Sequence, residues 1–161
     1  MRWLIILVAL VGVTAAALAL REHYRTGDSP CSINEKWDCG KVNKSPYAVI
    51  GGLWVETGPD APPGFLQRHF PAIARIPVAV VGLVGYLLLA IVAFKRWWHF
   101  LTVVAVLALV FSLYLAHVEK DILEVWCIYC VLSLVVISVI TLLAITMSIV
   151  QFVRRPKAAQ A

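Results

Sequence analysis

Four long apolar runs without a charged residue are the feature that most constrains this chain. They cover residues 3–20, 76–94, 97–116 and 127–153, and none of them contains Asp, Glu, Lys or Arg. Because a helix rises about 1.5 Å per residue, each run is long enough to cross a hydrocarbon core of ~30 Å. Strands are excluded because the runs lack period-two alternation and four strands could not close their edges in lipid. The sequence therefore predicts an all-α membrane protein, a single domain built as a four-helix transmembrane bundle.

The composition agrees with this fold class. Of the 161 residues, 61% are hydrophobic and 14% are charged, against ~45–50% and ~25% in a typical soluble domain. A water-soluble enzyme and an intrinsically disordered chain are therefore excluded. The uncharged spans count against an ion pump or carrier. Their hydroxyl groups are expected to bond to their own helix or to a neighbouring one.

The distribution of charge predicts the orientation of the bundle. All nine acidic residues fall within residues 21–75 and 117–126, on one side of the membrane. The other side carries no acidic residue and six basic ones, which are Arg2, Lys95, Arg96, Arg154, Arg155 and Lys157. By the positive-inside rule both termini face the cytoplasm and residues 21–75 form an extracytoplasmic loop. The net charge of +5 thus indicates topology, and no nucleic-acid partner is expected.

The first apolar run has a second interpretation, as a cleaved signal peptide that ends in small residues. An uncleaved span is favoured because residues 3–20 exceed the usual apolar core of ~7–15 residues. The loop stays outside in either case. Within the loop, residues 47–55 are mostly apolar but too short to span, which predicts a short helix or re-entrant piece that caps the bundle. Residues 95–96 form a very short connection, so the second and third spans should be antiparallel neighbours.

The four cysteines carry the chemical signal, and all lie on the outer, oxidising side. Cys31 and Cys39 are in the loop, whereas Cys127 and Cys130 open the fourth span as a Cys-x-x-Cys motif. Residues three apart share one helical face, so these two sulfurs can bridge. The positive end of the helix stabilises a thiolate, which is the attacking species in disulfide exchange.

The depth of each sulfur predicts a division of roles. Cys130 lies about one turn deeper than Cys127, where it can meet an apolar oxidant such as a membrane quinone. Cys127 is nearer water, within reach of a loop cysteine. The Cys31-x7-Cys39 pair lies in a polar, flexible segment and could carry electrons from a protein on the water side. Four cysteines allow three connectivities, and a relay needs Cys31–Cys39 and Cys39–Cys127 in turn.

Two other interpretations of the cysteines stay open at this point. The first is a non-catalytic membrane subunit whose disulfides only staple an exposed loop. The second is a zinc site, which is disfavoured because one Cys-x-x-Cys motif is present and Cys-x7-Cys is not a usual finger spacing. No metal is expected.

The order and spacing of these motifs resemble the vitamin K epoxide reductase family over nearly the whole chain. The matching pieces are Cys31-x7-Cys39, Ser45 six residues later, residues 76–82 at the start of the second span, and the motif at residues 127–130. The resemblance implies a four-helix bundle around a quinone, capped by the outer loop.

The same resemblance implies a role for each site residue. Cys130 would react with the quinone, and Cys127 would exchange with Cys39. Cys31 would face a soluble thiol protein, and Ser45 would be a polar residue near the reacting centre. The redox-active disulfides would be Cys31–Cys39 and Cys127–Cys130.

Two departures from the family pattern bear on the substrate. Animal enzymes that reduce vitamin K epoxide place an Asn early in the second span and a Tyr seven residues after the first cysteine of the Cys-x-x-Cys pair. Those positions are Val78 and Leu134 here. Bacterial members often carry a fused thioredoxin-like domain, whereas only residues 154–161 follow the last span here, so the partner would act in trans. Both points favour a bacterial-type, disulfide-forming member.

The sequence therefore predicts an enzyme of the bacterial inner membrane with its active site on the periplasmic side. We expect it to take electrons from a periplasmic or lumenal thioredoxin-fold protein and to reduce a quinone, either ubiquinone or menaquinone of the vitamin K type. The alternative within the same chemistry is reduction of a vitamin K epoxide, driven by a reduced thiol protein. A non-catalytic subunit, and then a carrier or channel, are the alternatives from other classes.

Overall fold

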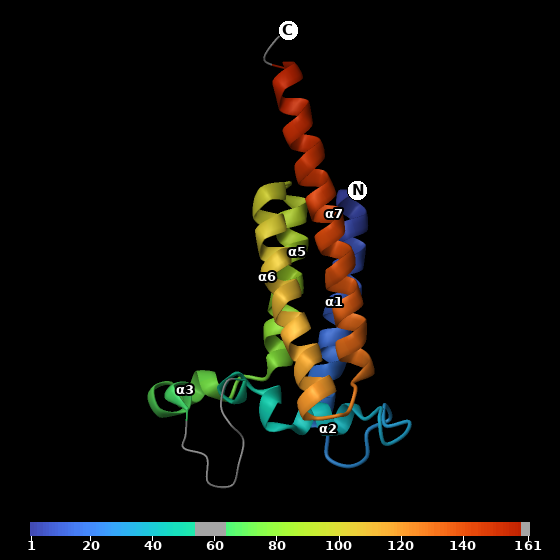
Figure 1. Ribbon diagram of the computed structural model, residues 1–161, viewed down its shortest axis with the longest axis vertical. Coiled ribbons are helices and arrows are strands. Elements are labelled where there is room, and N and C mark those ends of the chain that lie inside the picture. Colours follow the sequence, from blue (N-terminus) through green and yellow to red (C-terminus); the bar gives the residue numbers. More distant parts are fainter. Residues whose placement is uncertain (54–63, 159–161) are drawn as a thin grey trace.

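The computed structural model describes residues 1–53 and 64–158. Four long helices lie side by side in a bundle (Figure 1), and they are α1 (Arg2–Tyr24), α5 (Val78–Phe94), α6 (Trp98–His117) and α7 (Ile128–Ala158). The N-terminus and the far end of α7 lie at one end of the bundle, and the segment between α1 and α5 lies at the other. The predicted all-α, four-helix architecture is confirmed.

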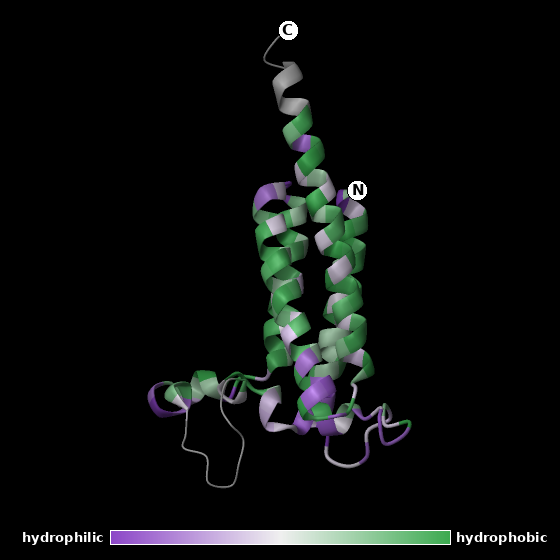
Figure 2. Cartoon of the chain, viewed as in Figure 1, coloured by the Kyte–Doolittle hydropathy of each residue, from purple (hydrophilic) through white to green (hydrophobic). Residues whose placement is uncertain are grey.

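The outer surface of the bundle is suited to lipid. Among the described residues, three helical stretches are long and apolar enough to cross a membrane, namely α1, residues 98–122 and residues 128–153. Helix α5 is shorter, with 17 residues. Apolar side chains such as Leu7, Leu107 and Leu142 point outward with 61%, 65% and 66% of their surface exposed. Figure 2 shows this apolar surface along the helices, with the hydrophilic residues gathered mainly at the loop end.

In the part of the loop that the structure describes, five short helices form the cap, and they are α2 (Cys39–Lys44), η1 (Pro46–Ala48), η2 (Ile50–Gly52), α3 (Phe65–His69) and α4 (Pro71–Ala74). The short element predicted at residues 47–55 corresponds to η1 and η2, and residues 54–55 lie outside the described residues. The Ile50 amide donates to the Ile76 carbonyl at 3.0 Å, and the Tyr114 hydroxyl donates to the Leu53 carbonyl. These bonds fasten the cap to the start of α5 and to α6.

Helices α1 and α5 pack closely because α1 presents small side chains. Ala9, Gly12 and Ala16 are buried on one face of α1. Lipid tails are as apolar as the side chains, so close packing rather than the hydrophobic effect holds such helices together. A Cβ atom on Gly12 would lie 2.5 Å from the Tyr86 ring. Glycine at this position therefore sets the distance between α1 and α5.

Helices α6 and α7 are joined by hydroxyl groups as well as by packing. The Thr141 hydroxyl donates to the Ala105 carbonyl across the interface at 3.2 Å. The Thr102 and Ser148 hydroxyls meet at 2.8 Å. Interhelical hydrogen bonds of this kind contribute about 1 kcal/mol each in a membrane. These contacts agree with the expectation that hydroxyls in the spans bond to their own or a neighbouring helix.

Candidate active site

A short backbone pairing brings the cysteine-bearing loop to the mouth of α7. The Trp126 amide donates to the Lys36 carbonyl at 2.8 Å, and the Asp38 amide donates to the Trp126 carbonyl at 3.0 Å. Asp38 then caps helix α2, because its carboxylate accepts the Lys41 amide at 3.1 Å. Cys39 is the first residue of that helix. The pairing thus holds Cys39 beside the residue that precedes Cys127.

The loop cysteines form a disulfide whose sulfur atoms are covered. Cys31 and Cys39 are bonded to each other, with their Cα atoms 5.6 Å apart. Cys31 is 5% exposed and Cys39 is fully buried. The sequence places this pair in a polar segment that we expected to be flexible. In the structure the pairing with Trp126 draws the segment over the end of the bundle, where both cysteines are buried.

Cys127 occupies the position just before α7 and is a free thiol. Its carbonyl accepts the first bond of the helix, from the Val131 amide at 3.0 Å. The side-chain amide of Asn43 donates to the Cys127 sulfur at 3.4 Å and to the Cys39 carbonyl at 2.9 Å. Cys127 is fully buried in one apolar cluster with Cys31 and Cys39. It is therefore less accessible to water than its place in the sequence suggests.

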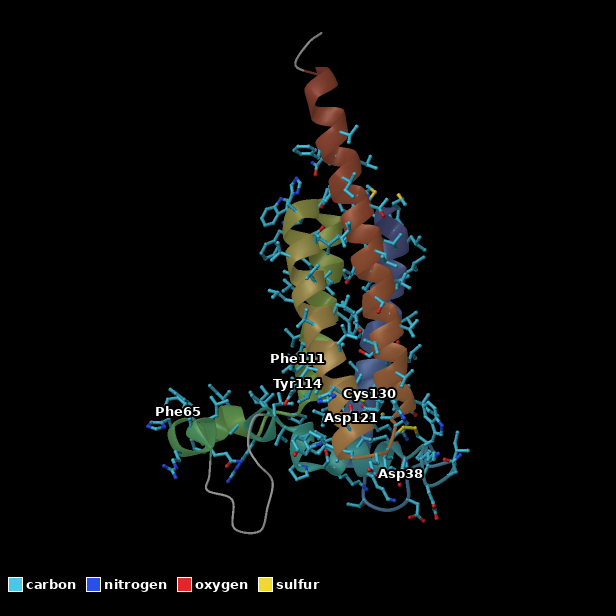
Figure 3. The ribbon with its side chains drawn as sticks, in the orientation of Figure 1. Asp38, Phe65, Phe111, Tyr114, Asp121 and Cys130 are labelled. Carbon is cyan, nitrogen blue, oxygen red and sulfur yellow. A yellow bond between two sulfur atoms is a disulfide. The ribbon has the colours of Figure 1, made fainter. Side chains whose placement is uncertain are left out.

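Cys130 is a half-buried free thiol on the wall of a cavity of about 380 Å³. Figure 3 places it at the loop end of the bundle, close to the level of Tyr114 on α6. Ser45 lines the same cavity, and its hydroxyl donates to the Val42 carbonyl at 2.8 Å. The structure thus brings Ser45 and Cys130 to one cavity, and it places Cys39 and Cys127 together in the adjoining apolar cluster.

The cavity is apolar except at a few points. Val78 of α5 and Leu134 of α7 both line it. The Tyr86 hydroxyl is held by Ser133, with its oxygen 2.7 Å from the serine hydroxyl and 2.8 Å from the serine carbonyl. Leu107 lines the cavity from α6 and also faces outward. The cavity therefore lies close to the lipid-facing surface, within the size range of small-molecule sites.

The surroundings of Cys127 favour its thiolate. A hydrogen bond from the Cys130 thiol lowers the pKa of Cys127 most, and the Asn43 amide adds to this effect. Burial and the nearby Glu119 carboxylate oppose the shift, but the net pKa lies below the ordinary value. In the loop, burial raises the pKa of Asp38 slightly, but hydrogen bonds from Ser32 and the α2 backbone outweigh it and leave that pKa lowered.

The model of the vitamin K epoxide reductase family matches residues 3–145, which include all four cysteines and the helices around the cavity. The chain belongs to the vitamin K epoxide reductase family. A comparison with curated proteins finds no match. As a member of this family the protein is a membrane oxidoreductase, and the resemblance inferred from its motifs is confirmed.

Glu119 is a site residue of this family member that the sequence analysis missed. It lies in the π-helical turn η3 (Val118–Ile122) at the end of α6, and it is 3% exposed. One carboxylate oxygen accepts the Cys127 amide at 3.0 Å, and its side chain is hydrogen bonded to the Cys130 thiol. An acidic residue just past an apolar run is ordinary, so its position gave no signal that it points inward.

Asn43 and His23 were also missed, although a spacing could have indicated the first. Asn43 follows Cys39 by four residues, which places both on one face of a helix. His23, near the end of α1, lies against the cavity, and its Nδ1 is 2.5 Å from the Asn43 carbonyl. Because a carbonyl oxygen only accepts, Nδ1 carries the hydrogen. His23 thus ties α1 to the helix that bears Cys39.

Proposed function

We propose that this protein is a quinone-linked thiol oxidase that makes disulfides in a soluble partner. Electrons would pass from a thioredoxin-fold protein in trans through Cys31 and Cys39 to Cys127 and Cys130, and then to a quinone. The observation that supports the proposal most directly is that the four cysteines lie next to one another. Cys39 and Cys127 share one buried cluster, and Cys130 lines the adjoining cavity.

The exchange steps conserve atoms and electrons among the sulfur atoms. A dithiol partner reduces the Cys31–Cys39 disulfide and leaves with a disulfide of its own. The Cys39 thiolate attacks Cys127 of a Cys127–Cys130 disulfide, and Cys130 leaves as a thiolate. Cys31 then attacks Cys39, which restores the loop disulfide and releases Cys127. The Asn43 amide, which helps to lower the pKa of Cys127, makes Cys127 a better leaving group in this last step.

The burial of Cys31 sets a condition on the first step. A partner thiol reaches this sulfur, which is 5% exposed, only when the loop opens. Two backbone bonds to Trp126 hold the loop closed, so opening costs the local contacts of residues 36–38 rather than the fold of the bundle. We infer that reduction of the loop disulfide and loop opening occur together.

The cavity fits a quinone ring and its apolar tail. Its walls are mainly apolar, with a few polar side chains near Cys130. When bound, a quinone supplies an acceptor of two electrons and two protons. Cys130 would face the ring, and Val78 and Leu134 would exclude water from it. Ser45 and Tyr86 line the same cavity, where their hydroxyl groups would orient its oxygens.

The test uses the purified full chain with a reduced thioredoxin-fold protein and a quinone, followed by quinone absorbance. The Cys39→Ala variant should lose oxidation of the protein partner. It should still reduce quinone when dithiothreitol, a small dithiol, is supplied to Cys127 and Cys130. The Cys130→Ala variant should lose both activities. Unchanged oxidation of the protein partner by Cys39→Ala would overturn the relay.

Reduction of a vitamin K epoxide is the second candidate, because the family description names that reaction. The cavity supports it less well, since apolar Val78 and Leu134 stand where the animal enzymes place Asn and Tyr. We expect little epoxide turnover by the wild-type protein with a dithiol. The double variant Val78→Asn/Leu134→Tyr should gain epoxide turnover relative to quinone turnover.

We further propose that the loop end faces the periplasm of a bacterial inner membrane and that both termini face the cytoplasm. The basic residues flanking the apolar runs at the terminal end support this orientation. A single cysteine introduced at Ser32, which is exposed, should react in intact cells with a thiol reagent that does not cross the inner membrane. A cysteine at Lys95 should react only after the membrane is opened. Both labelling reactions are measured in a variant of the protein that lacks the four native cysteines.

A further inference from the structure

A buried carboxylate touches both members of the Cys-x-x-Cys pair. Glu119 accepts the Cys127 amide through one oxygen at 3.0 Å and is hydrogen bonded to the Cys130 thiol. It is 3% exposed and lines the cavity that Cys130 lines. A buried carboxylate is costly to keep unless it has partners. Here the partners are the Cys130 thiol, which must lose a proton, and the backbone amide of Cys127, whose sulfur bonds to that of Cys130.

The backbone around Glu119 is specialised to turn this side chain inward. The Leu123 amide donates to the Val118 carbonyl at 3.0 Å, five residues back, which makes the turn π-helical. Such turns are rare and occur mostly at functional sites. Glu124 then adopts a φ of 54°, a left-handed conformation that side chains other than glycine seldom take. These two irregularities connect α6 to the mouth of α7 in only a few residues.

We propose that Glu119 is the catalytic residue that moves a proton between the Cys130 thiol and the quinone oxygen. This inference rests on the proposed function. The carboxylate accepts the proton of Cys130 as the S–H bond breaks, and the sulfur becomes a thiolate. As the Cys127–Cys130 bond forms, two electrons pass to the quinone, and the Glu119 carboxyl delivers the proton to a quinone oxygen. The second proton comes from the Cys127 thiol, so two thiols and a quinone give a disulfide and a hydroquinone.

Other titratable groups face the same cavity, and they are His23 of α1, Tyr47 of η1, Tyr86 of α5, and Tyr129 of α7. The Nδ1 of His23 is hydrogen bonded to the Asn43 carbonyl, and the Tyr86 hydroxyl is hydrogen bonded to Ser133. Glu119 differs from these two because its hydrogen bonds reach the reacting cysteines themselves. A carboxylate in direct contact with a thiol can take its proton without an intervening water.

The test compares Glu119→Gln with Asp121→Asn, a change of an exposed carboxylate in the same π-helical turn (Figure 3). The first readout needs no quinone. It is the rate at which Cys130 of the reduced protein is alkylated by a small apolar reagent, measured against pH. With Glu119→Gln we expect the rate at neutral pH to rise, because the thiolate is the form that is alkylated and the carboxylate that repels it is gone. Asp121→Asn should match the wild type.

The second readout is one turnover of quinone reduction by the reduced protein. It should slow about 100-fold in Glu119→Gln, the scale of general acid–base catalysis, and Glu119→Asp, which keeps a carboxyl group, should recover part of the rate. Glutamine can still accept the Cys127 amide, and thermal unfolding of each variant verifies the fold. Should Glu119→Gln misfold, the turnover rate of Glu119→Asp decides, since a displaced carboxyl group must slow the proton transfer.

The two hypotheses fail separately. If the wild type reduces no quinone, the proposed function is wrong, yet the alkylation profile still shows whether the Glu119 carboxylate acts on Cys130. If Glu119→Gln keeps the wild-type alkylation profile and turnover rate, the role of Glu119 is overturned while the quinone-linked function stands.

Discussion

The two ends of this bundle are built from the same four helices but are packed in opposite ways. In the terminal half, around Ile5, Leu101 and Ala144, the side chains between the helices are fully buried. In the loop half the helices surround a cavity, and buried polar groups such as Glu119 and Asn43 stand beside the cysteines. One half therefore supplies cohesion, which leaves the other half free to hold a ligand and ionisable groups.

Two glycines show how the sequence makes this difference. A Cβ atom on Gly12 would lie 2.5 Å from the Tyr86 ring, whereas a Cβ atom on Gly85 would meet nothing within 4 Å. Gly12 permits close contact between helices, and Gly85 leaves space in the cavity that it lines. The same residue type thus permits close packing of α1 against Tyr86 at one position and leaves space in the cavity at another.

The largest effect is expected from removal of the cavity thiol. Cys130→Ser should lower single-turnover quinone reduction about 1,000-fold or more, because a serine hydroxyl does not form the attacking anion at neutral pH. Quinone absorbance with dithiothreitol as the reductant measures this step. Cys31→Ser is the control, since it leaves the Cys127–Cys130 pair intact and should keep the rate. Equal rates in Cys130→Ser and the wild type would show that the cavity sulfur is not the one that reacts.

A matched pair of leucines tests the contrast between the halves through stability. Leu101 is fully buried in the terminal half, and Leu134 lines the cavity. Leu101→Ala should lower the free energy of unfolding by about 2–5 kcal/mol, because it creates a void in close-packed surroundings. Leu134→Ala should cost less, since it only enlarges an existing space. Thermal unfolding in detergent or lipid gives both values, and equal losses would show that the cavity half is packed as tightly as the other.

Filling the cavity should separate ligand binding from fold. Gly85→Leu places a side chain in open space, so we expect the fold to survive and quinone reduction to fall about 10- to 100-fold. Gly12→Leu would instead collide with Tyr86 and lower the unfolding temperature. Quinone KM and thermal unfolding of both variants distinguish the two effects. Normal quinone kinetics in a folded Gly85→Leu protein would place the quinone elsewhere.

Much of the fold could be predicted from the sequence because the signal is local. Each uncharged run reports its own span, and the short connection at residues 95–96 fixes two helices as neighbours. Helix α1 continues to Tyr24, past the apolar run that ends at residue 20, so hydropathy locates the span but not the end of the helix. Residues such as Arg21 leave the apolar pattern but remain good helix formers.

The site was less predictable because its geometry depends on contacts between distant segments. Cysteine spacing indicated the two pairs, and one of them, Cys31–Cys39, is a disulfide here. Burial of Cys39 and Cys127 depends on the pairing of residues 36–38 with Trp126, which no local pattern encodes. The inward turn of Glu119 depends on a π-helical hydrogen bond, and neither propensity nor periodicity predicts one.

The smallest expected effect concerns the ionisation of Cys127 and follows from its bond with Asn43. The Asn43 amide helps to lower the pKa of Cys127, so the thiolate forms at a lower pH than in an ordinary cysteine. Asn43→Leu should raise that pKa, which moves the rise in thiolate absorbance to higher pH. Asn43→Asp should raise it further, because a carboxylate repels the thiolate and donates no hydrogen bond.

Each titration is read as the difference from a matching variant that also carries Cys127→Ser. Lys44→Gln is the control, since Lys44 is exposed on the same helix and its loss should move the midpoint less. Cys127 leaves as a thiolate when Cys31 attacks Cys39, so the Asn43 variants, whose Cys127 thiolate is less stable, should carry out that exchange more slowly than the wild type. If Asn43→Leu leaves the midpoint unchanged, the pKa of Cys127 is lowered by Cys130 and the helix end rather than by Asn43. The buried Asn43 amide would then serve only to hold α2 against α7.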